Sequence, residues 1–439
     1  MSQNFPSFAE AFRVWLRIGC LSFGGPAGQI ALMHREVVES RRWVSETRFL
    51  HALNFCTLLP GPEAMQLATY LGWLMHGVRG GVAAGLLFVL PGALVLLALS
   101  LVYAAFGQVP VISAVFLGLK SAVLVLVIEA LLKVARRALR GRVAWGAAVA
   151  AFLALFLGGV PFPLVVLAAG LLGLAVPHAF ATGGHGKAGQ GGDSLLDAHL
   201  AAHPGYIAAM APGARRAGLV ALALWIWPVV LLRESGGVMG DVAWFFSKMA
   251  VVTFGGAYAV LAYVAQEAVE HYHWLSAPEM LAGLGLAETT PGPLILVLQF
   301  VGFLAGFRHG GGYWGGVAAS ALTLWVTFLP CFAWIFLGAP FIERLHDIAR
   351  LKGALAAVTA AVVGVIANLA VWFALRVVFA QLRPGWLGVE WPEPASLQWV
   401  PLAISLAAAA ALLWRKLGVL PVLALSAGLG VAARVLGLV

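Results

Sequence analysis

The chain has 439 residues, of which 62% are hydrophobic and only 10% are charged, a balance that exceeds what a soluble core of this size needs. Its net charge of +9 is typical of arginine-rich cytoplasmic loops in a membrane protein, so we expect no nucleic-acid partner. The strand alternation of an outer-membrane barrel is absent. The composition therefore predicts an all-α polytopic membrane protein.

Apolar runs recur along the chain, and one membrane span needs about 20 such residues. The runs are 79–107, 110–132, 142–160, 217–232, 313–340, 353–380, 397–414 and 418–437. An earlier apolar run ends in Gly-Gly-Pro at 24–26 and lacks a cleavage site after a basic leader. We therefore expect the N-terminal segment to be retained.

The chain contains an internal repeat. Ser-Phe-Gly-Gly at 22–25 returns as Thr-Phe-Gly-Gly at 253–256, and Pro-Gly-Pro at 60–62 returns at 291–293, both displaced by 231 residues. Further along, the displacement is 239 residues, which pairs Ala122 with Ala361. The predicted organisation is a first repeat at 1–176, a polar cytoplasmic linker at 177–216, an inverting transmembrane helix at 217–232 and a second repeat at 233–439.

Charge placement predicts that the two repeats have opposite orientations, because cytoplasmic loops accumulate Lys and Arg. The loop at 133–142 of the first repeat is basic, whereas the matching loop of the second repeat carries Glu390 and Glu393. We expect an inner-membrane protein with its N-terminus in the cytoplasm and its C-terminus in the periplasm. Inverted repeats are typical of secondary transporters, whose substrate site lies at the repeat interface near the membrane centre.

The repeated glycine and proline motifs are expected to break helices inside the membrane. Glycine permits positive φ, and proline in the first turn starts a helix. Irregular backbone at this depth is tolerated where it is buried in protein or lines a wet cavity. We expect four such breaks, at the tips of re-entrant hairpins, to meet and to present helix N-termini to a small oxyanion. The alternative is that the motifs only kink membrane-spanning helices.

Polar side chains add candidates to this site. Lys120 is an intramembrane cation and hence a candidate anion contact, the alternative being an ion pair with Glu129 or Glu63. Glu63 and Glu288 flank the Pro-Gly-Pro motifs, where they could carry coupling protons or simply cap or pair within the fold. The candidate substrate-binding residues are Ser22, Phe23, Gly24, Gly25, Pro26, Gln29, Pro60, Gly61, Pro62, Gln66, Lys120, Thr253, Phe254, Gly255, Gly256, Pro291, Gly292 and Pro293.

Other functional classes are disfavoured. The linker histidines (His178, His185, His199 and His203) and the three cysteines have no compact metal-ligand spacing, so we predict neither a metal nor a cofactor. No Walker motif is present for an ATP-driven pump, and no zinc-protease or serine–histidine pattern indicates a membrane-embedded enzyme. A channel is a further alternative function.

The run from Phe23 to Ile30, followed by Trp43 and Leu-Pro-Gly-Pro at 59–62, resembles the signature of the chromate transporter family. The resemblance covers nearly the whole chain outside the linker and is of the long-chain type, with two fused halves. It implies efflux of chromate across the inner membrane, and thereby chromate resistance. The inverted repeats lead us to expect that this efflux works by alternating access around a central oxyanion site.

The second half departs from this pattern, since Ala257 replaces Pro26 and Val260 replaces Gln29. The departures predict that the halves contribute unequally, with the fuller site in the first. Sulfate is the alternative substrate, because it is also a tetrahedral dianion of similar size. The sequence leaves a homodimer open.

Overall fold

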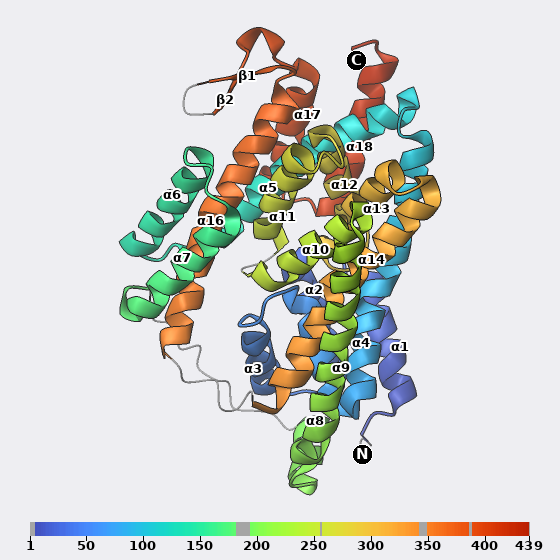
Figure 1. Cartoon of the computed structure of the whole chain (residues 1–439), viewed down its shortest axis with the longest axis vertical. Helices are drawn as coiled ribbons and strands as arrows, with labels where there is room; N and C mark the ends of the chain where they lie inside the picture. Colours follow the sequence, from blue (N-terminus) through green and yellow to red (C-terminus); the bar gives the residue numbers. More distant parts are fainter. Residues whose placement is uncertain (1–4, 181–193, 255–256, 342–348, 386–388, 439) are drawn as a thin grey trace. The chain divides into compact units, whose positions relative to one another are not determined.

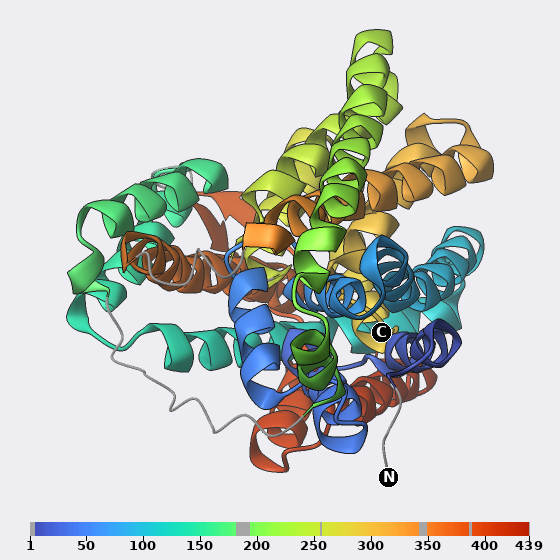
Figure 2. The same cartoon turned by 90° about the horizontal axis from the view of Figure 1, so that it is seen from below.

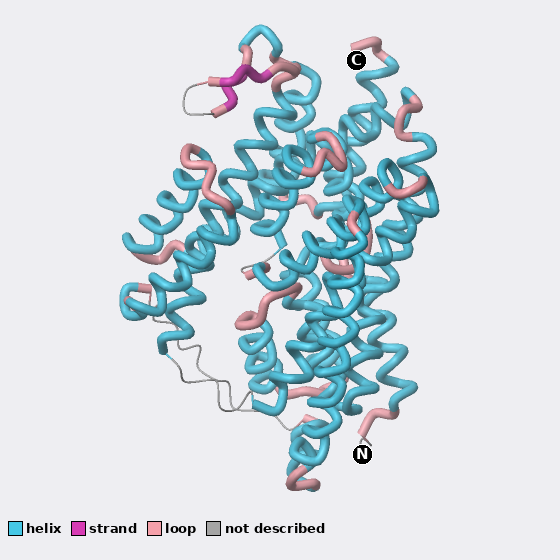
Figure 3. Tube along the Cα trace, viewed as in Figure 1, coloured by secondary structure: helices cyan, strands magenta, loops and turns pink. Residues whose placement is uncertain are grey.

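The computed structural model describes residues 5–180, 194–254, 257–341, 349–385 and 389–438 of the chain. Helices dominate throughout these ranges, and one pair of short strands is present (Figure 3). The chain forms two compact units, and each of them takes segments from both halves of the sequence. The protein is an all-α polytopic membrane protein.

The first unit comprises Met1–Leu97, Gly183–Gly256 and Thr290–Ile348. Its described helices are α1 (Phe8–Leu21), α2 (Gly25–His34), η1 (Arg35–Ser40), α3 (Glu46–Cys56), α4 (Glu63–Phe106, which ends in the second unit), α8 (Leu195–Ala202), α9 (Tyr206–Ser235), α10 (Gly237–Val252), η4 (Leu294–Leu296), α13 (Val297–His309), α14 (Gly312–Gly338) and η5 (Ala339–Phe341) (Figure 1).

The second unit comprises Ala98–Thr182, Ala257–Thr289 and Ala349–Val439. Its described elements are α5 (Pro110–Ala138), α6 (Arg142–Phe156), α7 (Phe162–Ala175), η2 (Pro177–Ala179), α11 (Ala257–Gln266), η3 (Glu267–His271), α12 (Ala277–Thr289), α16 (Ala349–Val378), β1 (Leu382–Pro384), β2 (Glu390–Pro392), η7 (Pro394–Ser396), α17 (Trp399–Ala409), η8 (Ala410–Trp414) and α18 (Val419–Val435).

All eight predicted apolar runs are helical. Within the described ranges, five helices are long and apolar enough to cross a membrane, namely Glu63–Phe106, Pro110–Ala138, Tyr206–Ser235, Gly312–Gly338 and Lys352–Val378. The remaining runs form shorter apolar helices. Large apolar side chains such as Leu94 and Leu171 are more than half exposed, which suits a surface that faces lipid.

Tight glycine turns fold two segments of the first unit into helical hairpins. In α4 the helix reverses at His76 and Gly77, where Gly77 has φ +61°. The arms then pack so closely that a Cβ added to Gly72 would lie 2.6 Å from the Cβ of Ala84. In the second half, α13 and α14 form the matching hairpin across Gly311, whose φ is +101°.

The second unit is built around two long helices, α5 and α16. Helices α17 and α18 pack on α5, and helices α6 and α7 pack on α16, as Figure 2 shows for the latter group. Two close approaches are equivalent in the two groups: a Cβ on Gly430 would lie 2.2 Å from the Ala114 carbonyl oxygen, and one on Gly173 would lie 2.4 Å from that of Gly353. The repeat in the sequence is therefore also a repeat in packing.

The predicted linker contains helices that the sequence analysis did not anticipate, namely α8 and the beginning of α9. Its Asp197 binds Arg48 at 2.7 Å (Nε to Oδ1). Burial opposes the charged form of Asp197, but hydrogen bonds from Ser194 and Ser45 and the Arg48 guanidinium lower its pKa below the usual value. This part of the linker is therefore docked. His185 lies outside the described residues.

Candidate functional site

The first helix break follows α1 and is shaped by glycine and proline. Gly24 and Gly25 have φ of +84° and +73°, values that an L side chain resists, and Pro26 occupies the first turn of α2. The Ser22 hydroxyl donates to the Ile18 carbonyl at 2.6 Å, so it bonds back to its own helix. The expected break followed by a helix start is confirmed here.

The second break separates α3 from α4 and contains Gly61, with φ +119°. In the second half, α10 ends before Thr253 and Phe254, and the break between α12 and η4 contains Gly292, with φ +92°. The Thr253 hydroxyl donates to the Met249 carbonyl, as Ser22 does one repeat earlier. Gly255 and Gly256 lie outside the described residues. All four breaks belong to the first unit.

Main-chain hydrogen bonds join the breaks of one half to those of the other. The Gly61 amide donates to the Thr253 carbonyl at 2.9 Å, and the Gly292 amide donates to the Ser22 carbonyl at 2.8 Å. A shift of 231 residues converts one bond into the other, with the donor and acceptor halves exchanged. Each Pro-Gly-Pro break is therefore fastened to the Phe-Gly-Gly break of the opposite half.

Buried glutamines strengthen this cluster. The side-chain amide nitrogen of Gln29 donates to the Gly292 carbonyl at 2.6 Å, that of Gln66 to the Pro60 carbonyl at 2.7 Å, and that of Gln299 to the Ala93 carbonyl at 3.0 Å. The three Oε1 atoms are buried and have no partner among the described residues. The donors of Gln29 and Gln66 are thus partly used in holding the breaks.

The glycines of the breaks differ in how much room the structure leaves for a side chain. No heavy atom of the described residues lies within 4 Å of a Cβ added to Gly24 or Gly25. A Cβ on Gly61, in contrast, would lie 2.8 Å from the Cys331 sulfur and 2.9 Å from the Gln66 amide nitrogen. Among the described residues, the N-terminus of α2 therefore has open space beside it and no side-chain cap, a setting in which free amides can bind an anion.

Lys120 and Glu288 belong to the second unit, and Glu63 begins α4 in the first. Glu129 forms an ion pair with Lys133 at 2.7 Å, and no ion pair between Lys120 and Glu129 is present in the described part of the chain. Lys120 is half-buried in the middle of α5. Glu288 is buried and accepts a hydrogen bond from the Tyr258 hydroxyl at 2.5 Å.

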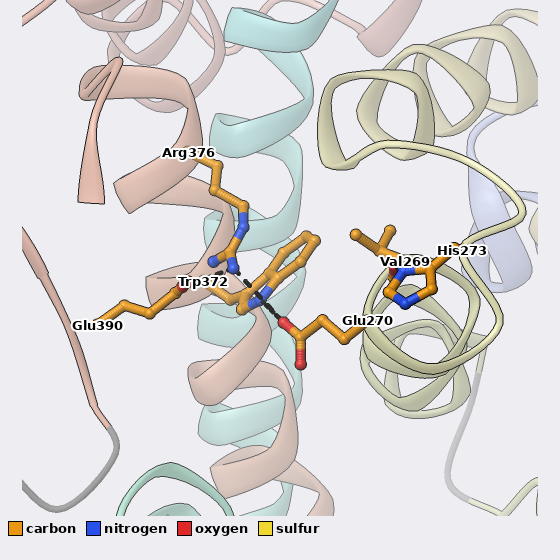
Figure 4. A network of polar contacts seen from close by, with 6 residues as sticks. All are labelled: Val269, Glu270, His273, Trp372, Arg376 and Glu390. Carbon is orange, nitrogen blue, oxygen red and sulfur yellow. Dashed lines mark hydrogen bonds and ion pairs between the residues drawn. The ribbon is translucent and has the colours of Figure 1, made fainter. Parts of the chain in front are cut away.

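A polar network that was not predicted from the sequence surrounds Arg376, near the end of α16 (Figure 4). Its Nη2 lies 2.5 Å from Glu390 Oε2 and 3.4 Å from Glu270 Oε1, and its guanidinium carbon lies 4.0 Å from the centre of the Trp372 ring. The indole nitrogen of Trp372 donates to Glu270 at 2.9 Å. The one signal in the sequence is an Arg four residues after a Trp on an apolar helix.

Comparisons with known proteins agree on one protein family. The family model described as chromate transporter matches residues 9–174 and 240–431. The chain is 34% identical to a chromate transport protein of Pseudomonas aeruginosa, over 82% of this chain and 79% of that protein. It is 26% identical to the chromate transport protein of Cupriavidus metallidurans, over 82% of this chain and 81% of the relative.

A third relative, a probable chromate transport protein of Synechococcus elongatus, is 26% identical over 82% of this chain and 83% of its own length. No solved structure matches the chain. The family model covers both halves and leaves out the whole predicted linker, together with the helix at 217–232. The chain belongs to the chromate transporter family.

Proposed function

We propose that the protein is a secondary transporter that exports chromate across the inner membrane and thereby confers chromate resistance. The observation that carries this proposal is the reciprocal pair of main-chain bonds, Gly61 to Thr253 and Gly292 to Ser22. These bonds fasten the four helix breaks into two pairs, each of which joins one half to the other. Broken helices near the membrane centre form the substrate sites of many transporters. Transport, rather than catalysis, is the activity that the family supports.

Chromate binds, in this proposal, at the first turn of α2. Gly24 and Gly25 leave open space there, and the uncapped amides and positive end of the helix dipole favour an anion. The break that contains Gly292 positions this turn through its hydrogen bonds with Ser22 and Gln29. The first half therefore supplies the fuller site, which agrees with the replacement of Pro26 and Gln29 by Ala257 and Val260 in the second half.

The membrane potential is sufficient as an energy source for export. Moving one charge through 100 mV changes the free energy by about 2.3 kcal/mol, so a dianion leaving an inside-negative cell gains about 4.6 kcal/mol. Glu63 and Glu288 are the candidate proton carriers if transport is coupled. Alternating access would arise from rocking of one repeat against the other around the breaks.

Radiolabelled chromate flux tests the proposal. Inverted inner-membrane vesicles that contain the protein should accumulate chromate when the lumen is made positive, and unlabelled sulfate should compete weakly. Vesicles from cells without the protein are the control. Flux that does not respond to the potential contradicts the energetic proposal, and stronger inhibition by sulfate than by unlabelled chromate would assign the protein to sulfate instead.

Reporter fusions test the proposed topology separately. A periplasm-active phosphatase fused after Arg140 should be inactive, and the same reporter fused after Glu393 should be active. These residues follow basic and acidic loops of opposite repeats. Activity of both fusions, or of neither, contradicts inversion and the assignment of the N-terminus to the cytoplasm and the C-terminus to the periplasm.

A further inference from the structure

Two cavities of the second unit occupy equivalent positions in the internal repeat. One has a volume of about 30 Å³ and is lined by Leu117 and Lys120 of α5 and by Arg376 of α16. The other has a volume of about 170 Å³ and is lined by Ala356 and Thr359 of α16 and by Arg137 of α5. A shift of 239 residues converts each set of α5 residues into the matching set on α16.

The third wall of each cavity repeats as well. Gln398 and Pro401, at the beginning of α17, line the smaller cavity, and Gly141 and Ala144, at the beginning of α6, line the larger one. These pairs are displaced by 257 residues, the displacement that also relates the close-packed Gly173 and Gly430. The cavities are therefore a repeated feature of the fold rather than isolated packing defects.

The two cavities lie at different levels of one antiparallel helix pair. Near the smaller cavity the first half of α5 meets the end of α16, and near the larger cavity the end of α5 meets the first half of α16. Lys120 and Arg137 are 17 residues apart on α5, which is about 25 Å along a helix. This distance approaches the thickness of the hydrocarbon core, about 30 Å.

Arg376 is held in a fixed position beside the smaller cavity. One of its nitrogens, Nη2, contacts Glu270 and Glu390, and the guanidinium stacks on Trp372 (Figure 4). These carboxylates are about half exposed, at 49% and 47% of the side chain, whereas the Arg376 side chain is only 14% exposed. The network therefore anchors one edge of the guanidinium from the solvent side.

Donors in the smaller cavity remain without acceptors. The second nitrogen of Arg376, Nη1, is buried and has no hydrogen-bond partner among the described residues. Lys120 forms no ion pair or hydrogen bond with any residue that the structure describes. Ser121 is already satisfied, because its hydroxyl donates to Leu117 at 2.9 Å and its carbonyl accepts from Ser405 at 3.1 Å. Buried donors of this kind require an acceptor.

The larger cavity is also basic. Arg137 and Arg140 line it, and neither forms an ion pair with a carboxylate within the described ranges. Thr359 takes the place of Lys120, and its hydroxyl donates to the Leu355 carbonyl at 2.7 Å. In each cavity, an arginine near the end of one long helix faces a residue in the first half of the other helix. The pairs are Arg376 with Lys120 and Arg137 with Thr359.

We propose that the cavity lined by Lys120 and Arg376 is a binding site for a small inorganic oxyanion, and that the cavity lined by Arg137 and Arg140 is its counterpart in the other repeat. This proposal deepens the proposed function: the two cavities are loading sites near opposite faces of the membrane, separate from the helix breaks. The smaller volume exceeds the roughly 10–15 Å³ needed for one water molecule, and binding of a larger tetrahedral anion requires the lining side chains to move.

Equilibrium binding of radiolabelled chromate to the purified full-length protein tests the inference. Lys120→Met should weaken binding by about tenfold, the loss expected for one charge-assisted hydrogen bond, and Lys120→Arg should restore most of it. Lys133→Met is the matched control, because Lys133 lies on the same helix, is 67% exposed and pairs with Glu129. Thr359→Lys should strengthen binding by supplying the second cavity with its missing cation.

Because the site at the beginning of α2 remains in Lys120→Met, the affinity and the number of chromate ions bound per chain are both measured. The inference is overturned if neither changes in Lys120→Met, or if Lys133→Met weakens binding equally. The measurement is independent of transport, so loss of binding in Lys120→Met supports the site even if the chain moves no chromate. Nanodiscs of phosphatidylcholine with and without phosphatidylglycerol separate a free anion from a lipid headgroup. Equal chromate affinity in both supports the inorganic anion, and loss of binding with phosphatidylglycerol assigns the cavities to lipid instead.

Discussion

The two units differ in the kind of polar group that they bury. In the first unit, the polar groups of the helix breaks are main-chain amides and carbonyls, joined across the two halves by bonds such as Gly61 to Thr253. In the second unit, long helices such as α5 and α16 carry charged side chains, Lys120 and Arg376 among them, beside small cavities. The comparison indicates that the first unit fixes the geometry of a site by its backbone, whereas the second concentrates charge.

The largest effect is expected from Gly61→Val, which should abolish chromate flux. At φ +119° an L side chain is strained, and its Cβ would collide with the Cys331 sulfur and the Gln66 amide. Flux in vesicles at matched protein levels measures the loss. Gly146→Val is the control, because Gly146 lies in α6 and an added Cβ would have no heavy atom of another described segment within 4 Å. Near-normal flux in Gly61→Val contradicts a role for the backbone of this break.

Gly25→Val should also abolish flux but should leave the protein inserted and folded. Its φ of +73° disfavours valine, yet the space before it is open, so no clash spreads into the structure. Thermal unfolding in detergent and flux are measured on the same preparation. Gly24→Asn is the comparison, since asparagine tolerates the left-handed region, and it should retain more flux than Gly25→Val. Equal flux in the two variants counts against the helix-tip site.

Gln29→Val tests how much the hydrogen bond from the Gln29 side chain to the Gly292 carbonyl contributes to stability. Valine already occupies the equivalent position, Val260, of the second half. Removing the amide leaves the Gly292 carbonyl without its side-chain donor, and an unsatisfied buried group costs about 1–3 kcal/mol. A lowered melting temperature with partial flux is expected. A melting temperature equal to that of the unmodified protein indicates that the bond contributes nothing to stability.

A smaller effect is expected in the second unit from Glu390→Gln. Glu390 is half-exposed, and Arg376 keeps Glu270 as a second carboxylate, so the change in free energy of unfolding should stay within about 1 kcal/mol. Chemical denaturation measures it, with Arg383 and its partner Glu393 providing the comparable exposed pair. A loss several times larger would mean that the network is a structural centre rather than an anchor.

The smallest effect concerns the docked linker. Because the pKa of Asp197 is lowered in the folded protein, its ion pair with Arg48 contributes stability above the ordinary carboxyl pKa, and this contribution disappears as the pH falls through the lowered value. Asp197→Asn should therefore increase the rate of protease cleavage near α8 at neutral pH. In this variant the cleavage rate should no longer rise as the pH is lowered. Identical cleavage of both proteins across the pH range contradicts docking by this pair.

The helix breaks could be predicted from the sequence because the responsible signals are local. Gly24, Gly61 and Gly292 all have positive φ, and repetition of their motifs distinguishes them from incidental kinks. The hydrogen bonds between breaks could not be predicted, since Gly61 and Thr253 lie 192 residues apart and meet only through tertiary packing. The sequence also left undecided whether Gln29 faces an anion or another helix.

The network of the second unit escaped prediction for a related reason. Arg376 pairs with Glu270 on a different segment, and nothing near either residue in the chain indicates this contact. The cavities require three helices to be in place before they exist. The one sequence feature that relates the cavities is the internal repeat. Its displacement of 239 residues pairs Lys120 with Thr359 and Arg137 with Arg376.

The proposed position of chromate is tested most directly by a structure of the protein with chromate bound, in which chromium is located by anomalous scattering. We predict a peak in the first unit beside Gly24 and Gly25, within hydrogen-bond distance of the amides in the first turn of α2. A peak beside Lys120 and Arg376 would add the proposed loading site. Occupied chromium positions elsewhere, with none at the beginning of α2, would contradict the proposal that the helix breaks bind the substrate.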